Sequence, residues 1–110
     1  MRLAIPGRFV SLCDTQNCIV LDLSGTGARL ALARPVGCGQ HGYVAVANFE
    51  LFGSVVRIEH GRRGGLNAMT FDEPIDKAQV IAIRHFAEGF ADREKAALRE
   101  QVRRWVSGER

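Results

Sequence analysis

The sequence lacks any long hydrophobic run. None of its apolar stretches approaches the roughly eighteen residues that a membrane-spanning helix needs. The first such stretch is interrupted at once by Pro-Gly-Arg at residues 6–8, which does not fit the continuous apolar centre of an export signal. We therefore expect a cytoplasmic protein without membrane insertion.

Cysteine and histidine are scarce and unpatterned. There are three cysteines, Cys13, Cys18 and Cys38, with no Cys-x-x-Cys pair and no histidine at metal-ligand spacing. Cys13 and Cys18 flank a four-residue turn and are placed to face each other across a hairpin, but burial as small apolar side chains is the expectation in the cytosol. The three histidines, His41, His60 and His85, have no carboxylate or cysteine at catalytic spacing. The sequence thus predicts no enzyme, no metal site and no cofactor.

The charge is only mildly unbalanced. The 110 residues carry a net charge of +3, with 46% apolar and 25% charged residues, as in an ordinary single-domain globule. Such an excess tolerates an anionic ligand, but the basic residues do not gather into the runs or single face of a dedicated DNA-binding protein. Tyr43, Phe49 and Phe52 do not alternate regularly with basic residues, so a nucleic-acid-binding barrel is the weakest reading.

Short β-like runs separated by turn residues fill the first two thirds of the chain. Six strands are predicted, over residues 9–13, 18–23, 28–33, 43–48, 52–59 and 66–71. Residues 34–39, with a proline and two glycines, predict a loop, and Gly53 predicts a bulge or a bend. The spacing indicates a mainly β fold, an antiparallel meander closed into a six-stranded β-barrel over about residues 3–72.

After Pro74 the pattern changes to that of helices. Residues 78–91 and 92–107 are rich in helix-forming residues, so the single domain 1–110 is expected to end in a helical segment over about residues 75–107. Gly89 is expected to separate the two helices, with Asp92 as the second N-cap and Gly108 just past its end. One apolar stripe runs along the second helix: Leu98, Val102, Trp105 and Val106. We expect the stripe to dock on the barrel, and a partner-binding role is the alternative.

The segment Asp-Leu-Ser-Gly-Thr-Gly at residues 22–27 carries more chemistry than a turn requires. It joins the second and third predicted strands, and its glycines allow a tight turn and a close approach to a ligand. Asp22 and Ser24 point the same way by the period of two, so together they can hold one polar edge of a small molecule. The structural alternative is a turn in which both side chains bond their own backbone.

A six-stranded barrel followed by a helix, with Asp-x-Ser-x-x-Gly at Asp22, Ser24 and Gly27, resembles the PilZ family of bacterial receptor domains for cyclic di-GMP. The resemblance extends over nearly the whole chain. Residues 5–9, Ile-Pro-Gly-Arg-Phe, resemble the segment before the first strand in a subgroup of the family. Residues 53–57, Gly-Ser-Val-Val-Arg, and 65–71, Gly-Leu-Asn-Ala-Met-Thr-Phe, resemble its last two strands.

The resemblance also implies a pair of arginines four residues apart, some twenty residues before the aspartate. Arg2 suits the second of them, whereas the first would fall before Met1, and Arg8 has Ala4 four residues earlier. Guanidinium groups can fork onto a phosphate or a guanine edge, and the Asp-Ser turn would accept the donors of a guanine. The implied site is therefore Arg2, Asp22, Ser24 and Gly27, with Arg8, Arg29 or Arg34 as compensating cations.

Two functions follow from this resemblance. The first is a cyclic di-GMP receptor domain whose binding is weakened by the incomplete arginine pair. The second is a degenerate PilZ domain without nucleotide binding, acting as a protein–protein adaptor in a motility, pilus or envelope pathway.

Overall fold

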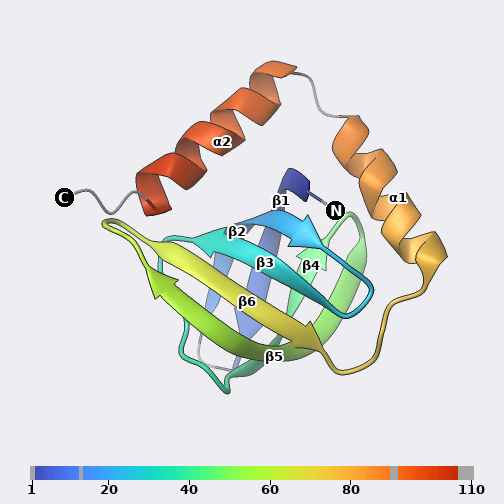
Figure 1. Cartoon of the computed structure of the whole chain (residues 1–110), viewed down its shortest axis with the longest axis horizontal. Helices are drawn as coiled ribbons and strands as arrows, with labels where there is room; N and C mark the ends of the chain where they lie inside the picture. Colours follow the sequence, from blue (N-terminus) through green and yellow to red (C-terminus); the bar gives the residue numbers. More distant parts are fainter. Residues whose placement is uncertain (1, 13, 90–91, 107–110) are drawn as a thin grey trace.

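The structure is a computed structural model that describes residues 2–12, 14–89 and 92–106, except for the side chains of residues 2, 92 and 93. Six strands form a closed barrel, and two helices lie along its outside (Figure 1). The elements are β1 (Arg2–Ser11), β2 (Thr15–Leu23), β3 (Gly27–Leu32), β4 (His41–Val46), β5 (Phe49–His60), β6 (Gly65–Phe71), α1 (Lys77–Glu88) and α2 (Asp92–Val106). The predicted fold class, a six-stranded antiparallel barrel followed by helices, is confirmed.

The order of strands around the barrel differs from the predicted meander. The ring runs β1-β2-β3-β6-β5-β4, so β3 pairs with β6, and β4 pairs with β1. Every neighbouring pair is antiparallel. The loop between β3 and β4 is long enough to carry the chain away from β3, whereas a tight turn would have forced β3 and β4 to pair.

The first strand starts much earlier than residue 9. β1 begins at Arg2 and includes Pro6 and Gly7, which were expected to lie ahead of it. Pro6 is opposite Ile19 of β2, and the pairing with β4 starts only at Arg8. With a single neighbouring strand at that point, β1 can include a residue that has no N–H to donate.

β4 and β5 are joined by a tight turn that was not predicted from the sequence. Ala47 and Asn48 have φ of 50° and 71°, the pair of positive values typical of a two-residue type I′ hairpin. β5 therefore begins at Phe49, and residues 47–48 leave the predicted fourth strand. Alanine is an unusual residue at this conformation, which explains why no turn was predicted.

The bulge predicted at Gly53 is also misplaced. The register shift in the β5–β6 ladder lies between Val55 and Arg57. A Cβ on Gly53 would overlap the Thr70 carbonyl oxygen and lie 2.9 Å from the Phe71 Cα, so this glycine serves a close approach of two strands.

Apolar side chains inside the barrel form the main core, which includes Ile83 of α1. A second, smaller core lies on the outer face of the barrel, where Ile19, Ala31 and Leu66 are covered by α2. The α2 residues packed there are Leu98, Val102, Trp105 and Val106. The predicted docking of this stripe is confirmed.

The glycine-rich turn between β5 and β6 is shaped by α2. A Cβ on Gly64 would lie 2.9 Å from the Cβ of Trp105, and a Cβ on Gly61 would overlap the Trp105 carbonyl oxygen. Both positions need glycine because the end of α2 lies directly on this turn.

The helix ends are only partly as predicted. Asp76 caps α1: its carboxylate accepts from the Gln79 N–H at 2.8 Å, and the Gln79 side chain accepts from the Asp76 N–H. Gly89 follows the last residue of α1 and separates the helices as predicted. Asp92 is the first residue of α2, and Gly108 lies outside the described residues.

Of the two cysteines that flank the first hairpin turn, only Cys18 is among the described residues. Cys18 is opposite Gly7 across the β1–β2 ladder, and Cys13 lies outside the described residues. Cys18 is buried and Cys38 exposed, both as free thiols. Burial raises the pKa of the Cys18 thiol to about 12, so this group holds almost no thiolate at neutral pH.

Thiol labelling tests this arrangement. In a Cys13→Ser variant at pH 8, a chromogenic disulfide reagent should modify Cys38 within minutes and Cys18 only after urea unfolds the protein. The thiolate is the reactive form, and Cys18 is both buried and protonated. Two thiols reacting at the same rate in the native protein would contradict the buried position of Cys18.

Candidate functional site

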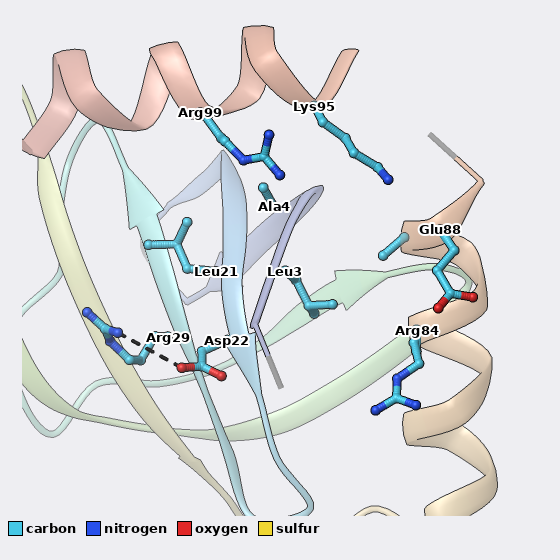
Figure 2. A pocket seen from close by; sticks show the side chains of 10 residues that line it. Leu3, Ala4, Leu21, Asp22, Arg29, Arg84, Glu88, Lys95 and Arg99 are labelled. Carbon is cyan, nitrogen blue, oxygen red and sulfur yellow. Dashed lines mark ion pairs between the residues drawn. The ribbon is translucent and has the colours of Figure 1, made fainter. Parts of the chain in front are cut away.

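A large cavity lies between the outer face of the barrel and the two helices (Figure 2). Its volume is about 730 Å³, within the range of about 300–1,000 Å³ typical of small-molecule sites. Ten residues line it: Leu3, Ala4, Leu21, Asp22, Arg29, Arg84, Ala87, Glu88, Lys95 and Arg99. Its floor is therefore the start of β1 with the β2–β3 hairpin, and its walls are α1 and α2.

Asp22 and Arg29 are the two predicted site residues that the structure brings together in this cavity. They are opposite each other in the β2–β3 ladder, and the Arg29 Nη1 lies 4.0 Å from the Asp22 Oδ2. The ladder shifts register between Val20 and Asp22, next to Leu21, which also lines the cavity. The Arg29 side chain is 51% exposed and that of Asp22 34%, so a ligand can reach both.

Ser24 has a different role in the structure. Its Oγ accepts from the N–H of Gly27 at 3.2 Å and of Thr26 at 3.3 Å, and lies 3.3 Å from the Thr26 hydroxyl. Its backbone N–H donates to the Gly27 carbonyl at 2.9 Å. Ser24 therefore bonds the backbone of its own turn and holds that turn in shape, whereas Asp22 faces the cavity.

Gly27 is explained by contact with a neighbouring strand. It is opposite Thr70 in the β3–β6 ladder, and a Cβ on it would overlap the Met69 carbonyl oxygen. Gly25, by contrast, has only the Ile75 carbonyl oxygen at 3.6 Å, an ordinary contact distance. The same turn receives hydrogen bonds from the Phe71 and Ile75 N–H groups, which anchor the segment leading into α1.

The remaining predicted arginines are distributed over the barrel. The backbone of Arg2 is opposite Asp22, so β1 brings this position to the cavity, and its side chain lies outside the described ones. Arg8 is exposed, farther along β1, and does not line the cavity. Arg34 bonds the carboxylate of Asp14 at 2.9 Å, which lowers the pKa of that carboxyl below its usual value.

Four charged residues of the cavity come from the helices and were not predicted: Arg84 and Glu88 of α1, and Lys95 and Arg99 of α2. Each pair is spaced four residues apart, which places its members on one helix face. That spacing is visible in the sequence. The sequence does not show the path of the helices, which turns these two helix faces toward the end of the barrel where Asp22 lies.

Comparisons with family models, with curated proteins and with solved structures find no match for this chain. None of the helices, over the part of the chain that the structure describes, has the length and apolar character to cross a membrane. The function is therefore argued from the cavity and its residues.

Proposed function

We propose that this protein is a PilZ-like receptor domain that binds cyclic di-GMP in the cavity between the barrel and the helices. The observation that carries the proposal is the placement of Asp22. The aspartate of the Asp-x-Ser-x-x-Gly motif lines this cavity, beside Arg29 and opposite the backbone of Arg2.

The chemistry of these groups suits a guanine nucleotide. A carboxylate accepts two hydrogen bonds side by side, which matches the ring N–H and amino group of guanine. A guanidinium can fork onto a phosphate or stack on a base. Asp22 would thus bind a guanine edge while Arg29 binds a phosphate, and Ser24 and Gly27 would act through the shape of the turn.

An adaptor without nucleotide is the second candidate, and two exposed apolar side chains of α1 favour it. Ile81 and Phe86 are 42% and 41% exposed, although the helix already buries Ile83 in the barrel core. Exposed apolar surface outside the core is a common feature of protein-binding sites. In this reading, the cavity holds no nucleotide and α1 contacts a protein of a motility, pilus or envelope pathway.

Titration calorimetry with cyclic di-GMP tests the receptor proposal. Asp22→Ala should weaken binding about tenfold or more, because a hydrogen bond to a charged group contributes about 1.5–3 kcal/mol. Asp14→Ala is the matched control: it removes an aspartate paired with Arg34 at the opposite end of β2 and should leave the affinity within about twofold. Absence of binding at high ligand concentration, or equal effects of both substitutions, would overturn the proposal.

A further inference from the structure

We propose that the two helices supply the phosphate-binding half of this cavity, with Lys95 and Arg99 of α2 as its principal cations and Arg84 of α1 as a further cation on another wall. The ligand class is a compact anion bearing two phosphates. The inference deepens the proposed function and rests on it for the guanine half of the ligand. The anion site itself can be tested without any guanine.

The first support is the charge of the cavity. Its lining contains four cationic side chains and two carboxylates, a formal surplus of two positive charges. One of the carboxylates, Asp22, already lies beside Arg29. Positive charges gathered in a partly enclosed space repel one another, and an anion between them relieves that repulsion.

The second support is a contrast along α2. Near its C-terminal end, Arg103 bonds the Glu100 carboxylate at 2.9 Å, and Arg104 bonds the Gln101 side chain. In its first half, Lys95 and Arg99 have no hydrogen bond or ion pair with any side chain that the structure describes. Of these four cations of α2, the two without a side-chain partner are thus the two that line the cavity.

The third support is the direction of these side chains. Figure 2 shows Lys95 and Arg99 extending from α2 into the cavity, with Arg84 extending from α1 on another side. The docked stripe of α2 includes Leu98, next to Arg99 in sequence, so barrel packing determines which way this part of the helix faces. Lys95 is also close to the N-terminus of α2, where the helix dipole disfavours a cation and favours an anion.

Binding at this position links the helices to the ligand. An anion held by Lys95, Arg99 and Arg84 contacts both helices at once, while Arg29 contacts it from the barrel. A ligand that binds only the folded, docked arrangement stabilises it by mass action. The thermal midpoint of the protein should therefore rise with the concentration of a suitable anion.

The experiment compares two probes, inorganic pyrophosphate and cyclic di-GMP, by calorimetry and thermal melting on the full chain. The test variant is Lys95→Gln/Arg99→Gln, and the matched control is Arg103→Gln/Arg104→Gln, which removes the same charge from the C-terminal end of α2, outside this cavity. The test variant should bind both probes at least tenfold more weakly and lose the thermal shift with pyrophosphate. The control should stay within about twofold of the parent.

The outcomes separate this inference from the proposed function. If pyrophosphate binds and depends on Lys95 and Arg99 while cyclic di-GMP does not bind, the anion site stands and the receptor proposal fails. If cyclic di-GMP binds with the same affinity to the test variant and the parent, the helices do not contribute and this inference is overturned. Equal losses in test and control variants would indicate general charge attraction and would likewise overturn it.

Discussion

Replacing Trp105 with alanine should lower the free energy of unfolding by about 3 kcal/mol. Trp105 is half-buried in the second core, where it covers the apolar patch of Ile19, Ala31 and Leu66 and packs against the β5–β6 turn. Replacing a fully buried aromatic side chain with alanine lowers the free energy of unfolding by about 3–5 kcal/mol. Because Trp105 is only partly buried, we expect a value at the lower end of that range. Urea denaturation followed by far-ultraviolet circular dichroism measures the change without using the lost tryptophan fluorescence.

The matched control for that substitution is Phe52→Ala. Phe52 is 54% exposed and contacts mainly the Tyr43 ring, with centroids 4.9 Å apart, so its loss should cost about 1 kcal/mol. If Trp105→Ala instead left the unfolding free energy unchanged, α2 would contribute little to the isolated domain. That result would favour a role of the helix in binding a partner.

Replacing Gly27 with alanine should destabilise the barrel by about 1–3 kcal/mol, the range for forcing extra atoms into a packed site. The added methyl would overlap the Met69 carbonyl oxygen, which is backbone in the paired strand β6 and cannot rotate away. Gly25→Ala, two residues earlier in the same turn, places its methyl at an ordinary contact distance of 3.6 Å from the Ile75 carbonyl oxygen and should have little effect. Thermal or urea melts of the two variants measure the difference.

This pair of variants also separates stability from ligand binding at the motif. If Gly27 serves the strand contact alone, the fraction of Gly27→Ala protein that is folded should bind cyclic di-GMP like the parent. An unchanged melting midpoint together with a large loss of affinity would contradict the packing explanation and return Gly27 to the ligand site.

The alternation of apolar residues and the turn residues between them were enough to predict six strands, the change to helix after Pro74 and the docking stripe on α2. These features depend on interactions between residues close in sequence, which is why the periods of two and 3.6 reveal them. The sequence did not reveal that β3 pairs with β6, or that β1 begins at Arg2, because strand partners are chosen by contacts across the whole barrel.

The candidate site, too, was predicted only in part from the sequence. The motif at residues 22–27 singled out Asp22 from sequence alone, because an acid next to a glycine turn is more than the turn requires. Only the tertiary structure assigned Ser24 to its own turn and Gly27 to the contact with β6. It also brought Arg84, Lys95 and Arg99 beside Asp22, although they are more than sixty residues away in the chain. Cavities are formed where elements distant in sequence pack together, so their charge is decided by the path of the helices and not by any local pattern.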